Sequence, residues 1–181
     1  MIITGGSCKG RKINTVKSRE VRPTSSKIRE SIFNMIYSSI TESVMLDLFA
    51  GSGIMGLEAL SRGAKKVYFV ENNPKVYRLL KENLANFDSN YEIKFSDALI
   101  ALDSFQNTKL DIIFIDPPYA SGLIEPVLIK IKDNSLLSED GIVIIEHSSN
   151  LKISDMITEL GFNILKEKKY GDTSITIVKN K

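Results

Sequence analysis

Cysteine and histidine are almost absent from this sequence, and their scarcity limits the sites that it can form. Among 181 residues there is one cysteine, Cys8, and one histidine, His147. A single cysteine cannot form an internal disulfide, which fits a reducing compartment. A structural zinc site draws most of its four ligands from these two residue types, so we expect no metal site.

Long apolar runs are missing as well. No segment reaches the roughly 20 consecutive apolar residues that cross a bilayer, and the N-terminus lacks the apolar core of a signal peptide. We therefore expect a cytoplasmic protein with no membrane partner. The hydrophobic content of 43% and the charged content of 25% are ordinary for a globular protein. The length is sufficient for one α/β domain with a sizeable core.

The net charge of +2 conceals an uneven distribution along the chain. Residues 1–30 carry eight basic and two acidic side chains, whereas residues 31–181 carry 16 basic and 20 acidic ones. A basic segment of this kind is either a solvated tail or a surface that binds the phosphates of a nucleic acid. The candidate RNA-binding residues within it are Lys9, Arg11, Lys12, Arg22, Lys27 and Arg29.

The apolar pattern divides the chain into a basic extension, residues 1–40, and a main domain, residues 41–181. Residues 1–16 predict a short glycine-rich β-ribbon. A helix follows, with Thr24 as a plausible N-cap and with Ile28, Ile32 and Ile36 on its apolar face. Arg29 lies off that face, which is why it is available as an RNA contact.

In the main domain, predicted strands alternate with helices, which is typical of a Rossmann-like, mostly parallel α/β sheet. The strands are expected at residues 44–48, 66–70, 91–95, 110–115 and 141–146. The helices are expected to end at residue 62, to begin at residue 74, and to cover residues 98–102, 123–132 and 153–160. Two β-like runs, 162–168 and 174–178, predict an antiparallel hairpin at the C-terminal end.

A glycine-rich loop follows the first predicted strand. Gly51, Gly53 and Gly56 form the pattern G-x-G-x-x-G between a strand and a helix, and Glu71 ends the next strand. Such glycines allow the backbone to approach a ligand closely, and an acid at this position can bind both hydroxyls of a ribose. The pattern alone fits a nicotinamide cofactor as well as S-adenosylmethionine.

Three features favour S-adenosylmethionine. Asp47 precedes the glycines, where it would repel a pyrophosphate but can bind a cationic amino group. Asp97 follows the third strand, where an adenine amino group needs an acceptor, and the terminal hairpin suits methyltransferases better than dinucleotide-binding folds. The structural alternatives are a turn-capping acid for Asp47 and a helix N-cap for Asp97. The predicted cofactor contacts are Asp47, Phe49, Gly51, Gly53, Glu71, Asp97 and Ala98.

The sequence Asp-Pro-Pro-Tyr at residues 116–119 directly follows a predicted buried strand. The prolines end strand pairing, and the acid and the ring are then held at the edge of the sheet where α/β proteins bind ligands. An exocyclic base amine is a poor nucleophile. The Asp116 carboxylate and the Pro117 carbonyl can accept its two N–H groups and stabilise the positive charge that develops, while Tyr119 stacks on the base. His147 follows the fifth strand without an activating neighbour, so a structural role is favoured.

Taken with these motifs, the chain resembles the bacterial 16S ribosomal RNA (guanine-N2)-methyltransferase family, essentially from end to end. The resemblance rests on Gly10-Arg11-Lys12, Arg22-Pro23-Thr24, the Asp47–Gly56 loop, Asp116–Tyr119, Glu146-His147 and Tyr170-Gly171-Asp172. It implies a seven-stranded S-adenosylmethionine fold whose last strand is antiparallel. It also implies a guanine in 16S rRNA of the assembled or assembling small subunit as the substrate, and a monomer is expected.

Other functions are left open by the residues themselves. The Asp116–Tyr119 motif is shared with DNA adenine-N6 methyltransferases, although the chain has no inserted domain for reading a DNA sequence. A non-catalytic RNA-binding assembly module would keep the basic extension but would not need this motif. The choice of guanine over adenine comes from the resemblance and not from the motif.

Overall fold

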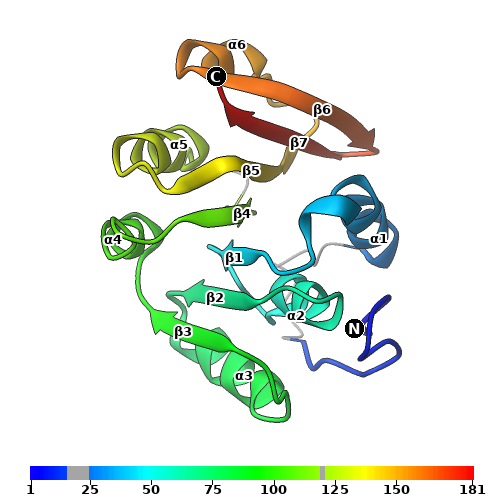
Figure 1. Ribbon diagram of the computed structural model, residues 1–181. Helices are drawn as coiled ribbons and strands as arrows, with labels where there is room; N and C mark the ends of the chain where they lie inside the picture. The colour runs from blue at the N-terminus through cyan, green and yellow to red at the C-terminus, as the bar shows by residue number, and fades with distance from the viewer. Residues whose placement is uncertain (16–24, 119–120) are drawn as a thin grey trace.

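The computed structural model describes residues 1–15, 25–118 and 121–181. Its strands form one seven-stranded sheet in the order β3-β2-β1-β4-β5-β7-β6 (Figure 1). All strands run parallel except β7, which is antiparallel to both of its neighbours. The Rossmann-like α/β fold with an antiparallel C-terminal strand is confirmed. The strands are β1 (Val44–Asp47), β2 (Lys66–Glu71), β3 (Tyr91–Phe95), β4 (Leu110–Ile115), β5 (Leu137–Ser148), β6 (Phe162–Tyr170) and β7 (Thr173–Asn180).

Helices cover both faces of this sheet (Figure 1). One apolar cluster joins α1, α2 and α3 to strand residues such as Met45 and Ile112. The other joins α4, α5 and α6 to Leu46 and Ile113, because consecutive strand residues point to opposite faces. None of the described helices has the length and apolar character to cross a membrane. The helices are α1 (Ser26–Met35), η1 (Tyr37–Ser39), α2 (Ile54–Ser61), α3 (Pro74–Leu84), α4 (Ala98–Asp103), α5 (Ile124–Asp133) and α6 (Ser154–Glu159).

The predicted elements are confirmed, with differences at their ends. The strand β5 begins at Leu137 instead of residue 141, because Leu137 pairs with Leu110 across a register shift in the ladder. The cap of α1 is also different. The Ser25 hydroxyl accepts a hydrogen bond from the Ile28 N–H at 3.3 Å, so Ser25 is the N-cap and the prediction of Thr24 was wrong.

The predicted β-ribbon at the N-terminus is smaller than expected. Within residues 1–15 it is reduced to one antiparallel bridge between Ile2 and Lys12. The segment is held instead by packing, since Ile3 and Ile13 are buried in the apolar cluster that includes α1 and α2. The division of the chain into a basic extension and a main domain stays a prediction.

Candidate active site

Five carboxylates mark the edge of the sheet at which the parallel strands end. Asp47, Glu71 and Glu146 lie at or near the ends of β1, β2 and β5, while Asp97 and Asp116 directly follow β3 and β4. Because β1 to β5 are parallel, their carboxyl ends meet at one edge, which is where open α/β sheets bind ligands. The motifs that the sequence singled out are therefore brought together, and Glu146 joins them.

The loop between β1 and α2 has the backbone that its glycines require. Gly51 and Gly53 adopt left-handed conformations, with φ of 55° and 79°. A Cβ on Gly53 would lie 2.5 Å from a Leu80 methyl carbon, so a larger residue does not fit there. Glu71 fixes the loop from β2, since its carboxylate accepts hydrogen bonds from the N–H groups of Gly51 (3.0 Å) and Asn73 (2.8 Å).

Asp47 is buried beneath this loop, with 1% of its surface exposed. Its carboxylate accepts a hydrogen bond from the Gly56 N–H at 3.1 Å. Burial raises the pKa of Asp47 to about 7, and the charge of Glu71 adds to the rise. Asp47 is thus a buried acid that caps the start of α2, and it is also a carboxylate whose ionised form a cationic ligand would stabilise.

Asp116 and Glu146 lie side by side on neighbouring strands. They are one position beyond Ile115 and Ile145, the last residues paired between β4 and β5. Alternation along the strands directs both acids, and Asp47, to the face covered by α1 and α2. Burial raises the pKa of Asp116 well above its ordinary range, and the charges of Glu146 and Asp47 raise it further.

Asp97 is the N-cap of α4, as the structural alternative predicted. Its Oδ1 accepts hydrogen bonds from the N–H groups of Leu99 (2.9 Å) and Ile100 (3.4 Å). The side chain of Asp97 is exposed, whereas Ala98 beside it is buried, and Phe49 packs partly buried against the α4 side of the sheet. Contacts of these three residues with a cofactor stay a prediction.

His147 has a structural role in this arrangement. Its ring is 2% exposed, with Nδ1 lying 2.9 Å from the Ser148 carbonyl and Nε2 lying 2.9 Å from the Thr176 hydroxyl. A carbonyl only accepts, so Nδ1 carries the proton and Nε2 accepts from Thr176. Burial lowers the pKa of His147, which keeps the ring neutral. This supports the structural role that the sequence favoured.

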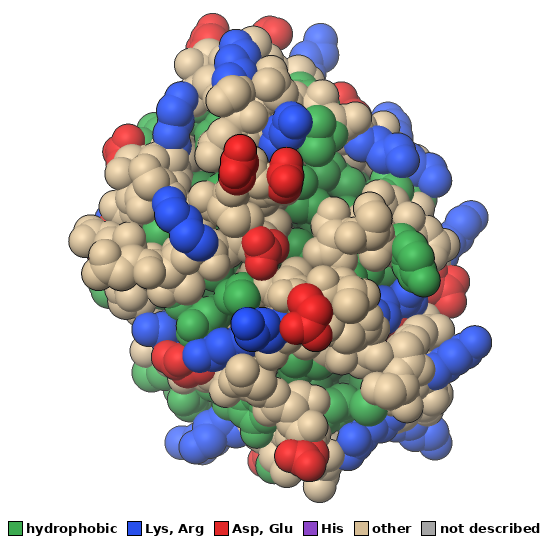
Figure 2. Space-filling model, viewed as in Figure 1, with side chains coloured by type: hydrophobic (Ala, Val, Ile, Leu, Met, Phe, Trp, Pro, Cys, Tyr) green, Lys and Arg blue, Asp and Glu red, His purple; other side chains and the backbone are tan. Residues whose placement is uncertain are grey.

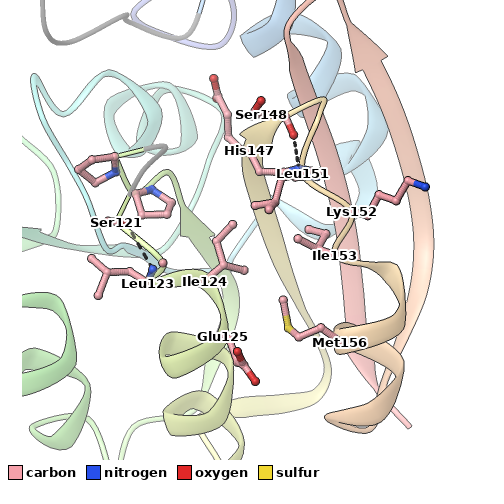
Figure 3. A pocket seen from close by; sticks show the side chains of 14 residues that line it. Ser121, Leu123, Ile124, Glu125, His147, Ser148, Leu151, Lys152, Ile153 and Met156 are labelled. Atoms are coloured by element: carbon pink, nitrogen blue, oxygen red, sulfur yellow. Dashed lines mark hydrogen bonds between the residues drawn. The ribbon is translucent and has the colours of Figure 1, made fainter.

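A pocket of about 340 Å³ opens beside Asp116 (Figure 3). Pro117 and Pro118 line it from the β4–α5 loop, Glu146 and His147 line it from β5, and residues of α5 and α6 flank it. Asp116 itself is not among the lining residues that the structure describes. Tyr119, the predicted stacking residue, lies outside the described residues. The remaining lining residues are Ser121, Gly122, Leu123, Ile124, Glu125, Ser148, Leu151, Lys152, Ile153 and Met156.

The predicted RNA-binding residues do not share one environment. Lys9, Lys12 and Lys27 are exposed, whereas the Arg11 guanidinium stacks 4.0 Å from the centre of the Phe87 ring and donates to the Asn86 carbonyl at 2.6 Å. Arg22 lies outside the described residues. In the view of Figure 2, basic side chains are spread around the rim of the molecule and do not form one patch.

The prediction that Arg29 contacts RNA was wrong. Its side chain is fully buried, with Nε donating to Glu58 at 3.1 Å and Nη2 donating to the Ile2 carbonyl at 2.5 Å. Glu58 also accepts from Thr4 and Arg62, so one carboxylate joins the N-terminal segment, α1 and α2. Charge counting missed this role, because it treats every basic residue as exposed.

Comparison with known proteins gives one consistent group. A family described as conserved hypothetical protein 95 matches residues 1–179. The ribosomal RNA small subunit methyltransferase D of Haemophilus influenzae is 35% identical over 98% of this chain and 93% of its own length. The protein of the same name from Escherichia coli is 37% identical over 80% and 73%. The solved structure of Thermus thermophilus hypothetical protein TTHA0928 is 26% identical, with a TM-score of 0.84 over 99% of both chains.

Proposed function

Because this chain belongs to the family of the ribosomal RNA small subunit methyltransferase D proteins, we propose that it methylates the exocyclic N2 amine of a guanine in 16S rRNA. The observation that carries this proposal is the meeting of Asp116–Pro117 with the Gly51–Gly53 loop and Asp47 at one edge of the sheet. The substrate would be the assembled or assembling small subunit, and the enzyme would act as a monomer.

The residues at this edge fit S-adenosylmethionine as the cofactor. When bound, this cofactor supplies an activated methyl group next to a positive charge. The backbone of Gly51 and Gly53 leaves room for close approach, and Asp47 offers a buried carboxylate to the amino group. Glu71 already holds the loop and is positioned for the ribose hydroxyls. Phe49, Asp97 and Ala98 complete the proposed cofactor contacts.

Asp116 and Pro117 would activate the guanine amine. Its lone pair is delocalised into the ring, so the amine is a weak nucleophile in solution. The Asp116 carboxylate and the Pro117 carbonyl accept its two N–H groups and draw the nitrogen towards tetrahedral geometry. The same two acceptors stabilise the positive charge that develops on nitrogen. The base would enter the pocket beside Pro117, stacked on Tyr119, after leaving the RNA stack.

The activity is tested with labelled S-adenosylmethionine and small subunits from cells that lack this enzyme. After digestion, label is expected in N2-methylguanine, and protein-free 16S rRNA is expected to be a poorer substrate than the particle. Small subunits that already carry the modification are the control. Absence of label in N2-methylguanine, in an assay where a known rRNA methyltransferase works, would contradict the proposal.

Replacing Asp47 with asparagine should weaken cofactor binding and stabilise the free protein at the same time. Asparagine can still accept from Gly56 but carries no charge, so cofactor affinity should fall about 10- to 100-fold. The pKa of Asp47 is raised from 3.8 to about 7 on folding. Ionisation in the folded protein is therefore unfavourable, and this acid makes the protein less stable as pH rises from 3.8 to 7.

The stability effect has a clear pH signature. The free energy of unfolding of Asp47→Asn should exceed that of the wild type by a few kcal/mol at pH 8, with little difference near pH 4. Urea unfolding at both pH values, with calorimetric titration of S-adenosylhomocysteine, measures the two effects. Asp133→Asn, a change at an exposed acid, is the control and should alter neither. Unchanged cofactor affinity in Asp47→Asn would remove Asp47 from the cofactor site.

A further inference from the structure

Guanine and adenine differ at the edge of the base that carries the exocyclic amine. In guanine the N2 amine lies beside N1–H, so the edge presents two neighbouring donors. In adenine the N6 amine lies beside an unprotonated N1, so the edge presents a donor and an acceptor. A site that places two hydrogen-bond acceptors side by side therefore selects guanine, because one acceptor would face the N1 lone pair of adenine.

The structure holds two such acceptors next to each other. Asp116 and Glu146 occupy equivalent positions on the adjacent parallel strands β4 and β5, one residue beyond the last paired residues. Neighbouring strands lie about 4.8 Å apart, and alternation directs both side chains to the same face. Glu146 is 3% exposed and lines the pocket together with Pro117, so it lies between the pocket and Asp116.

We propose that Glu146 is the residue that selects guanine: its carboxylate accepts the N1–H of the target base while Asp116 and Pro117 accept the N2 amine. This rests on the proposed function and adds to it the atom by which guanine is told from adenine. With adenine in the same position, the Glu146 carboxylate would face a lone pair, and no hydrogen bond would form. A buried polar group left without its partner disfavours the wrong base strongly.

The other polar residues that line the described pocket are less suited to this role. The two ring nitrogens of His147 are used by Ser148 and Thr176. Lys152 is a donor and cannot accept N1–H. Glu125 projects from α5 at the far end of the pocket from Ser148 (Figure 3). Glu146 is thus the described acidic residue that combines a place in the pocket wall with adjacency to Asp116.

The test compares guanosine 5′-monophosphate with the 5′-monophosphate of 2-aminopurine riboside. Both carry the 2-amino group, but 2-aminopurine has an unprotonated N1. Binding is measured by titration calorimetry or ligand-observed NMR at up to millimolar nucleotide, with S-adenosylhomocysteine present. The wild type should prefer the guanine nucleotide about tenfold or more, the discrimination expected of a direct base contact. Glu146→Gln, which is isosteric but uncharged, should lose most of this preference.

Two further variants make the result specific. Glu125→Gln removes the same charge from the same pocket and should keep the wild-type preference. Glu146→Asp keeps a carboxylate and should also prefer the guanine nucleotide, which matters if Glu146→Gln proves unstable. Equal affinity of the wild type for the two nucleotides, no binding of either, or an unchanged preference in Glu146→Gln would each overturn the proposal.

The result is separable from the fate of the proposed function. If the wild-type enzyme does not label N2-methylguanine in small subunits, the proposed function fails, whatever the nucleotides do. If it does label N2-methylguanine but Glu146→Gln keeps the binding preference, the proposed function stands and only the role of Glu146 is wrong.

Discussion

Replacing Asp116 with asparagine is expected to lower kcat for small-subunit methylation about 10²- to 10³-fold, with cofactor affinity nearly unchanged. Asparagine keeps the shape of the side chain and one acceptor oxygen. It removes the negative charge that would stabilise the cationic nitrogen as it forms, and this stabilisation exists only near the transition state. The loss should therefore appear in kcat and not in the affinity for S-adenosylhomocysteine.

The pH dependence provides a second readout for Asp116. Burial, followed by the charges of Glu146 and Asp47, raises the pKa of Asp116. The ionised form is the active one, so kcat/KM of the wild type should fall as pH decreases through this raised pKa. Asp116→Asn cannot titrate and should lose that part of the acidic limb. Saturating cofactor keeps the titration of Asp47 from dominating the profile.

A matched control exists on the neighbouring strand. Asp140 lies on β5 but is exposed, so Asp140→Asn makes the same chemical change away from the edge that holds the site. It should retain wild-type kcat and the wild-type pH profile. A rate for Asp116→Asn within a few-fold of the wild type would mean that the amine is activated by other groups.

The sequence predicted the fold because its signals are local. Strand β4 has the predicted bounds, since an apolar run of this length followed by Asp116-Pro117-Pro118 leaves few alternatives. The motifs at the ends of parallel strands also required no knowledge of distant contacts, because the topology brings those ends together. Glu146 followed the same rule at the end of β5, and applying the rule to every strand would have identified it.

Arg29 shows where local reasoning stops. Its position in the helical pattern places it off the apolar face, which predicts exposure. Its burial depends on Glu58, 29 residues away, and on the backbone of Ile2, two partners that periodicity cannot reveal. The raised pKa of Asp47 is similar, since it follows from burial beneath α2 and not from the neighbouring sequence. Contacts distant in sequence determine both residues.

Glu58 is the residue whose loss should destabilise the protein most. Its carboxylate is fully buried and accepts from the Thr4 N–H at 2.8 Å, from Arg29 Nε at 3.1 Å and from Arg62 Nη2 at 2.8 Å. Glu58→Ala leaves the Arg29 guanidinium, itself fully buried, without its ionic partner. Breaking a buried pair from one side costs about 3–5 kcal/mol, so the free energy of unfolding should fall by that amount.

Glu92→Ala is the control for this measurement by urea unfolding. Glu92 also contacts two basic residues, Lys66 at 3.4 Å and Lys94 at 3.7 Å, but its side chain is 48% exposed. Exposed ion pairs contribute about 0–1 kcal/mol, so this variant should lose little stability. The comparison separates burial from the number of ionic contacts, which is the same for both acids in Arg and Lys partners.

Acid should have the same effect as the Glu58 substitution. Burial alone would raise the pKa of Glu58, but hydrogen bonds from Thr4 and Arg62 and the charge of Arg62 outweigh it, so the pKa is lowered below 4.5. The stabilisation is therefore complete above pH 4.5 and is lost as pH falls through the lower pKa of the folded state. Glu58→Gln, which cannot ionise, should lack this contribution to the acid dependence.

The Glu58 variants also test how the basic N-terminal segment is held. Thr4 belongs to the same segment as Lys9 and Lys12, two of the proposed RNA contacts, and Glu58 is its buried anchor. Where Glu58→Gln remains folded, its affinity for small subunits should fall while its affinity for S-adenosylhomocysteine persists. A loss of less than about 1 kcal/mol in Glu58→Ala would show that packing of Ile3 and Ile13 suffices to hold the segment.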